Sequence, residues 1–148
     1  MSRTLCAGVI VFLCIFMQIQ FGECNLTNKN SADEIRNVIK GAVEDTTWLR
    51  ATTQKDLEQL LGAYYTWPAL QGLIESTWNF VKVPTDWEYL VTTDNCAITH
   101  IFGKKANAQA DILETDEITG ITYLSKMEYS LVYTKKGWKI SGIRTICP

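Results

Sequence analysis

The spacing of apolar residues changes once along this chain, from a helical period to a strand period. Between residues 34 and 81 apolar side chains recur three and four positions apart, as on one face of an amphipathic helix. From residue 86 onwards the large apolar residues fall at every second position, which is typical of half-buried strands. Helices therefore precede strands without alternation, and the pattern predicts an α+β fold with an antiparallel sheet covered on one face by helices.

The helical part is expected to contain three helices. Ser31 and Glu34 have the spacing of a capping box, which predicts where the first helix begins. Thr53 is the expected cap of the second. Pro68 is expected in the first turn of the third, because a missing N–H is tolerated there. The expected ranges are 31–48, 53–64 and 67–81.

About five strands are expected in the second part. Turn residues at 94–95 and 103–104 separate the first three predicted strands, and Gly137 is expected in the turn of a C-terminal hairpin. On both sides of that turn the apolar residues keep one parity, so Tyr129 and Trp138 are expected to point into the core. The expected strand ranges are 87–92, 97–102, 106–114, 122–134 and 138–147.

The first 23 residues are expected to lie outside the fold. Arg3 precedes an unbroken apolar run from Ala7 to Met17, which has the length of a signal-peptide core and is short for a membrane span. Two alternatives stay open: a cleaved signal peptide with a mature N-terminus near Cys24, or an uncleaved N-terminal anchor that tethers the protein to a membrane. Both predict an extracytoplasmic protein, secreted or periplasmic, with a linker at 24–30 and one domain at 31–148.

Composition and charge narrow the function classes. With 148 residues and 47% hydrophobic content, the chain can form one domain with a core that needs no cofactor. Its net charge is −2, and no basic run is longer than two residues, which argues against a nucleic-acid-binding protein.

The cysteines do not have the spacing of a metal site. Cys6 and Cys14 fall in the leader, and neither a C-x-x-C motif nor a nearby histidine accompanies the other three. In an oxidising compartment Cys96 and Cys147, at the ends of predicted strands, are the candidate disulfide pair. The alternative is that Cys96 is a small buried residue with a free thiol.

Several stretches of the chain resemble a known superfamily. Three helices followed by an antiparallel sheet that ends in Gly-Trp-Lys-Ile resemble the nuclear transport factor 2-like (cystatin-like) superfamily, and more closely the intermembrane-space (IMS) domain of chloroplast-division proteins and their cyanobacterial relatives. The resemblance implies a cone-shaped fold, with three helices packed on a bent sheet and a pocket between them. The matching stretches are Tyr65-Thr66-Trp67-Pro68-Ala69-Leu70, Trp78, Trp87 to Tyr89, Ala106 to Glu114, Tyr129 to Leu131 and Trp138 to Ile140.

Two polar residues are candidates for catalysis. His100 is the only histidine and could act as a general base, but it shares the parity of Ile98 and Phe102, which favours a packed, hydrogen-bonded side chain. Glu114 has the parity of the alanine-spaced strand, so it is expected to face the helices and to pair with Arg144. Neither residue has a partner by spacing that would make a catalytic group, and we assign no catalytic residue.

The aromatic residues suggest a binding surface. Tyrosine and tryptophan build both cores and protein-binding hot spots, and four of them are the expected lining of a cleft between helices and sheet: Tyr65, Trp67, Trp78 and Tyr129. We therefore expect an exported, non-catalytic module that binds a protein segment or a hydrophobic small ligand. The alternative is an isomerase-like or other small-molecule enzyme with its active site in the cone.

Overall fold

The computed structural model describes residues 29–83 and 88–146 of the chain. The predicted leader, its cleavage site, most of the linker and Cys147 lie outside these residues. The chain divides into two compact units, Met1–Asp33 and Glu34–Pro148. In the first unit residues 29–33 are helical.

The helical part contains a first helix that ends at residue 44, followed by α2 (Gln54–Leu61) and α3 (Ala69–Val81). α2 begins as predicted: the Thr53 side chain accepts the Asp56 N–H, and the Asp56 carboxylate accepts the Thr53 N–H. The predicted capping box at Ser31 is wrong, because residues 29 and 30 are already helical. Lysine and asparagine at these positions, without proline or glycine, do not prevent the helix from starting earlier.

The first helix also ends earlier than expected. Asp45 Oδ1 accepts the Thr47 N–H at 2.8 Å, a local bond that competes with helical hydrogen bonding. A short 3-10 helix, η1 (Thr47–Arg50), follows. The other carboxylate oxygen of Asp45 accepts the Tyr64 hydroxyl at 2.9 Å, which ties this corner to the end of α2. These hydrogen bonds lower the pKa of Asp45, and the bond from the Thr47 N–H has the largest effect.

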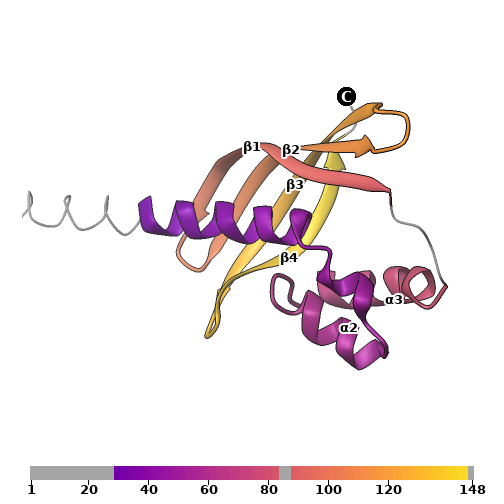
Figure 1. Ribbon diagram of the computed structural model, residues 1–148. Helices are drawn as coiled ribbons and strands as arrows, with labels where there is room; N and C mark the ends of the chain where they lie inside the picture. Colours follow the sequence, from indigo (N-terminus) through magenta and orange to yellow (C-terminus); the bar gives the residue numbers. More distant parts are fainter. Residues whose placement is uncertain (1–28, 84–87, 147–148) are drawn as a thin grey trace, which may run out of the picture. The chain divides into compact units, whose positions relative to one another are not determined.

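The described part of the second half is a four-stranded antiparallel sheet in the order β1-β2-β3-β4 (Figure 1). Its strands are β1 (Tyr89–Phe102), β2 (Lys105–Asp116), β3 (Thr122–Thr134) and β4 (Gly137–Ile146). The α+β class is confirmed, but the expected count of about five strands is corrected to four. The two predicted strands on either side of residues 94–95 form the single strand β1, because the chain passes this point as a β-bulge instead of a turn.

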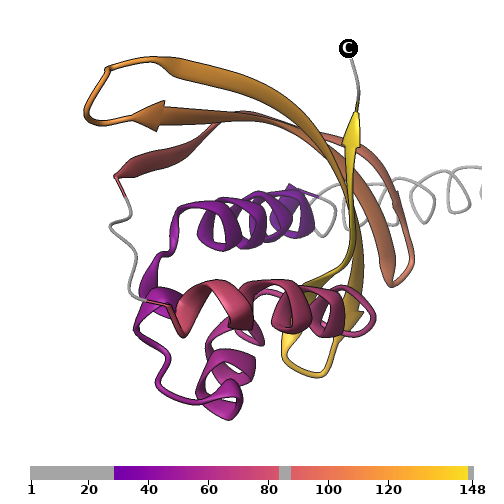
Figure 2. The same cartoon turned by 90° about the vertical axis from the view of Figure 1, so that its right-hand side faces the viewer.

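The core lies between the helices and one face of the sheet (Figure 2). Along β2 every second residue from Ala106 to Ile112 is buried, and Tyr129 and Leu131 of β3 and Trp138 and Ile140 of β4 keep the same face. The sheet curves around the helix at residues 34–44, which contributes Ile35 and Ile39 to the core. The alternation predicted for the central part of the sheet is therefore confirmed.

Side chains of this first helix also form hydrogen bonds with backbone groups along the free edge of β1. Glu44 Oε1 accepts the Thr93 N–H at 3.1 Å, at the bulge where the ladder of β1 and β2 is interrupted. Arg36 Nε donates to the Cys96 carbonyl at 3.4 Å. A backbone group at a bulge or on the free edge of a strand has no ladder partner, and these bonds supply one.

The segment that connects α2 to α3 is fixed on the opposite edge of the sheet. Tyr65 forms a parallel bridge with Ile140, with hydrogen bonds from the Ile140 N–H to the Tyr64 carbonyl at 2.9 Å and from the Thr66 N–H to the Ile140 carbonyl at 2.8 Å. The Lys139 ammonium donates to carbonyls at the end of α2, that of Gly62 at 3.1 Å and that of Ala63. Lys139 therefore acts as a C-terminal cap of α2.

Candidate functional site

Helices α2 and α3 form a groove that opens to solvent, with a volume of about 840 Å³. α2 contributes three of its lining residues, the segment between the helices contributes Trp67, and α3 contributes the rest. We call it the Trp67 groove, and its lining residues are Gln54, Lys55, Glu58, Trp67, Leu70, Gln71, Ile74 and Glu75. Its volume is within the range of sites that hold a small ligand or an anchoring side chain.

Trp67 is the most informative residue of this groove. Its side chain is 72% exposed, which is unusual for a residue type that is normally mostly buried. Its indole N–H donates to Gln71 Oε1 at 3.2 Å, and the Gln71 amide donates in turn to Glu75 Oε1 at 3.1 Å. This chain of bonds runs along one side of α3 and orients the indole while leaving its faces open.

The groove has an apolar floor and a charged rim. Leu70 and Ile74 are half-buried and pack against the hydrophobic core. Lys55, Glu58 and Glu75 are exposed around them. An apolar floor with a few charged groups at its border is the usual composition of a binding site for an apolar side chain with polar neighbours.

The four predicted cleft residues do not line one surface. Tyr65 and Tyr129 are buried, at 9% and 3% exposure, and belong to the core. The Tyr65 hydroxyl donates to the Ala42 carbonyl at 3.4 Å. Burial raises the pKa of Tyr65 to about 12 and also raises that of Tyr129, so both hydroxyls stay neutral. Trp78 is half-buried against the core, and Trp67 is the one residue of the four that is largely exposed.

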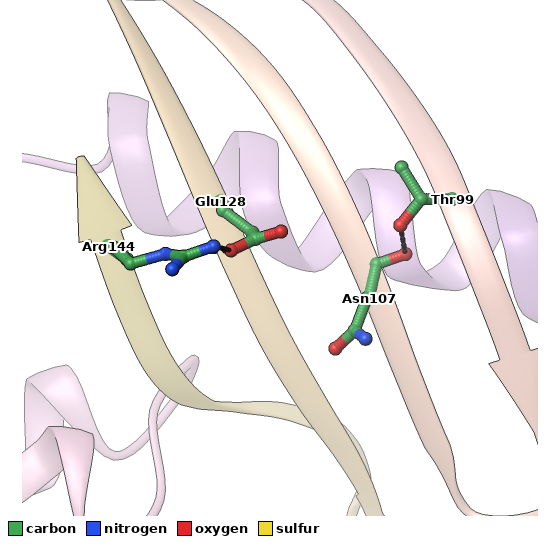
Figure 3. A network of polar contacts seen from close by, with 4 residues as sticks. All are labelled: Thr99, Asn107, Glu128 and Arg144. Atoms are coloured by element: carbon green, nitrogen blue, oxygen red, sulfur yellow. Dashed lines mark hydrogen bonds and ion pairs between the residues drawn. The ribbon is translucent and has the colours of Figure 1, made fainter. Parts of the chain in front are cut away.

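His100 is exposed, so the expectation of a packed, hydrogen-bonded histidine is wrong. A second bulge lies between Ile98 and His100, and it turns His100 to the uncovered face of the sheet. There its ring stacks with that of Phe102, with centroids 6.4 Å apart. Thr99, the extra residue of the bulge, donates from its hydroxyl to the Asn107 carbonyl at 3.1 Å (Figure 3).

Glu114 is also exposed, and the expected pair with Arg144 is not formed. Glu114 lies opposite Tyr123, which is itself 57% exposed, so both side chains at this end of the sheet face solvent. Arg144 pairs instead with Glu128 of the neighbouring strand, with Nε 2.9 Å from Oε2 (Figure 3). Register decides the pairing, because Arg144 and Glu128 are directly opposite each other.

The candidate disulfide between Cys96 and Cys147 stays a prediction, because Cys147 lies outside the described residues. Cys96 has a free thiol in the described part of the chain and is half-buried. Burial raises its pKa, and the Arg36 guanidinium partly opposes that effect.

Two absences concern the described residues alone, that of a metal-binding cluster and that of a membrane-spanning helix. In residues 29–83 and 88–146, no group of three or more metal-binding side chains has the geometry to hold an ion. Within the same ranges, no helix has both the length and the apolar character needed to cross a membrane.

A second, smaller recess of about 350 Å³ lies between α3 and β4. Small residues dominate its lining, and their short side chains leave the space open. They are Pro68, Ala69, Gly72, Leu73, Ser76, Ser141, Gly142 and Ile143. A cleft between helices and sheet was expected, but none of its four predicted residues lines this recess, and the groove between α2 and α3 was not expected, because both depend on how α3 is placed beside its neighbours.

Comparison with known proteins relates this chain to others by fold. No family model and no curated protein matches it. Among solved structures, the intermembrane-space region of the chloroplast protein ARC6 has a TM-score of 0.52 at 14% identity, over 79% of this chain and 97% of that one. A nuclear transport factor 2-like superfamily protein from Salmonella enterica serovar Typhimurium has a TM-score of 0.53 at 16% identity, over 82% and 93%.

A third similar structure is described as a putative aromatic ring hydroxylase from Novosphingobium aromaticivorans. Its TM-score is 0.54 at 15% identity, over 80% of this chain and 91% of that one. Identities this low establish a shared fold and no shared activity. The resemblance to the nuclear transport factor 2-like superfamily is confirmed at the level of fold.

Proposed function

We propose that this domain is a protein-interaction module that receives an apolar side chain of a partner segment in the Trp67 groove. The observation that carries the proposal is the 72% exposure of Trp67 beside a groove of about 840 Å³. Tryptophan is one of the residue types that are enriched among the hot spots of protein interfaces, and exposed apolar surface often marks such an interface.

The groove also defines what the partner segment should look like. Leu70 and Ile74 favour an aliphatic or aromatic anchor. Glu58 and Glu75 outnumber Lys55 on the rim, so a basic residue next to the anchor is favoured. A hydrophobic small ligand in the same groove is the second occupant that this composition supports.

We further propose that the domain works outside the cytoplasm, as the apolar segment near the N-terminus suggests. The alternative of an enzyme stays a hypothesis. The exposure of His100 on the uncovered face of the sheet weakens it, because that side chain is the candidate general base and is turned away from the helix-covered side.

The test is a selection of peptides from a displayed library on the wild-type protein, followed by calorimetric titration of each selected peptide. Trp67→Ala should weaken binding by at least about 2 kcal/mol, the threshold for a hot spot. Phe102→Ala is the matched control, since Phe102 is similarly exposed, at 77%, but lies on the sheet. His100→Gln should leave binding unchanged.

Peptides that bind the Trp67→Ala variant as tightly as the wild type would refute the groove as the binding site. Circular dichroism confirms beforehand that each variant is folded. A loss of binding with His100→Gln, together with retention in Trp67→Ala, would favour the enzyme hypothesis.

A further inference from the structure

The fold brings two lysine pairs together at one end of the sheet. Lys104 and Lys105 lie at the turn between β1 and β2, and Lys135 and Lys136 form the turn between β3 and β4. In a sheet of this order the two turns lie at the same end. The Tyr133 N–H donates to the Lys104 carbonyl at 2.8 Å, which places the turns side by side.

Exposed aromatic side chains accompany these lysines. Phe102 is 77% exposed and lies directly opposite Lys105 in the register of β1 and β2. Tyr133, at the start of the second turn, is 46% exposed. We call this surface the lysine tip, and it consists of Phe102, Lys104, Lys105, Tyr133, Lys135 and Lys136.

The positive charge of the lysine tip is not neutralised. None of its four lysines forms an ion pair with a carboxylate of the described residues, whereas Lys126, further along the sheet, pairs with Asp111 at 2.7 Å. Burial is the main cause that lowers the pKa of Lys139, and repulsion from the nearby Lys136 ammonium is the second cause. Positive charge therefore accumulates at this end of the sheet.

The lysine tip is open to solvent, and its four lysines are exposed. Both turns contain a glycine with positive φ, Gly103 at 57° and Gly137 at 93°. A Cβ atom placed on either glycine would meet no described heavy atom within 4 Å. A flat partner could therefore contact both turns at once.

We propose that the lysine tip docks on the surface of an anionic lipid bilayer, with its lysines at the headgroups and Phe102 in the interface. An ammonium near an anionic membrane is attracted to it, and an aromatic ring is stabilised at the boundary between headgroups and acyl chains. Phe102 favours a membrane over an acidic protein segment, because its exposed ring lies at the end of β1, next to the turn, where an apolar medium can reach it from outside. Four lysines on two short turns are also few for a nucleic-acid site.

The experiment uses the full chain with vesicles of phosphatidylcholine alone or mixed with phosphatidylserine. Amide hydrogen exchange is read at the two turns, Gly103–Lys104 and Lys135–Gly137, so that any binding through the apolar segment near the N-terminus does not affect the result. We expect slower exchange at both turns with phosphatidylserine vesicles and no change with phosphatidylcholine alone. Unchanged exchange with both kinds of vesicle would overturn the proposal.

Paired substitutions then test the lysines. Lys104→Gln with Lys105→Gln should lower the ratio of anionic to neutral partition coefficients about thirtyfold, since each lysine contributes about 1 kcal/mol and 1.4 kcal/mol is a factor of ten. Lys40→Gln with Lys82→Gln changes the net charge equally, away from the lysine tip, and should leave the protection of the turns intact.

Phe102→Ala should shorten the lifetime of the bound state, because it removes the ring from the interface. Equal protection in the Lys104, Lys105 variant and the wild type would refute the role of the lysines. Protection of the turns by a polyglutamate peptide or a single-stranded oligonucleotide, but not by vesicles, would assign the lysine tip to another anionic partner and refute the membrane proposal.

Discussion

Trp138 is the residue at which the packing of the C-terminal hairpin can be tested most directly. It is the second residue of β4, is 4% exposed, and its ring meets that of Tyr133 edge-on at 5.4 Å between centroids. Its indole N–H is buried and has no hydrogen-bond partner in the described part of the protein. The side chain therefore stabilises the fold through packing, while its polar atom opposes burial.

These two contributions predict different costs for two substitutions. Trp138→Ala removes a buried large aromatic and leaves a cavity, which should destabilise the protein by about 3 to 5 kcal/mol. Trp138→Phe leaves a smaller cavity and also removes the unpaired N–H, whose burial costs about 1 to 3 kcal/mol. The two terms oppose each other, so Trp138→Phe should lie within about 1.5 kcal/mol of the wild type.

Urea denaturation followed by far-ultraviolet circular dichroism measures both variants without relying on tryptophan fluorescence. Trp67→Ala is the control, because a 72% exposed side chain should change stability by less than about 0.5 kcal/mol. An unchanged midpoint for Trp138→Ala would show that the hairpin register is wrong. A cost for Trp138→Phe as large as that for Trp138→Ala would refute the argument from the unpaired N–H.

Three further predictions concern the helices and their contacts. Gly41→Ala should cost about 1 to 3 kcal/mol in urea denaturation, because the added Cβ would overlap the Tyr64 ring; with Tyr64→Ala in the same protein the Gly41 substitution should become neutral or stabilising, since alanine favours a helix over glycine. Glu44→Ala should cost about 1 to 2 kcal/mol and speed amide exchange at Thr93, since it removes the acceptor of that N–H, and unchanged exchange would contradict the bond. Stability should fall above pH 10, because the unfolded chain loses the Tyr65 proton near its usual pKa of 10.0 while the folded protein keeps it to about 12; urea midpoints should fall less steeply with pH in Tyr65→Phe.

Local chemistry was sufficient to predict several elements. The cap at Thr53 follows from a side chain and a backbone N–H only three residues apart, so no distant part of the chain can change it. The buried face of β2 follows from Ala106 to Ile112 in the same way, because a regular strand alternates without exception. Both predictions are confirmed.

Bulges account for the main errors in the sheet. A bulge adds one residue to one strand, and its position depends on which acceptor the neighbouring element offers, as Glu44 does for Thr93. The sequence around residues 94–95 has the composition of a turn, and only the partner strand shows that the chain continues. The second bulge reverses the parity of His100. The side chain that was expected to be packed and hydrogen-bonded is therefore exposed.

The candidate site was predictable in composition but not in arrangement. Aromatic residues at core and surface positions have the same sequence pattern, so Trp67 could not be separated from Tyr65 and Tyr129 before burial was known. The arrangement of the lysine tip could not be predicted from the sequence either. Neither lysine pair is unusual in sequence, and their proximity follows from the strand order.

The bridge between Tyr65 and Ile140 has a consequence for the kinetics of binding. The chain between α2 and α3 is hydrogen-bonded to β4 on both sides of Tyr65, and Lys139 holds the end of α2. A groove whose two walls are joined through such a segment is already formed before a ligand arrives, so little ordering entropy is lost on association. Association rates should therefore be limited by diffusion and orientation, and differences in affinity among ligands should come mainly from their rates of dissociation.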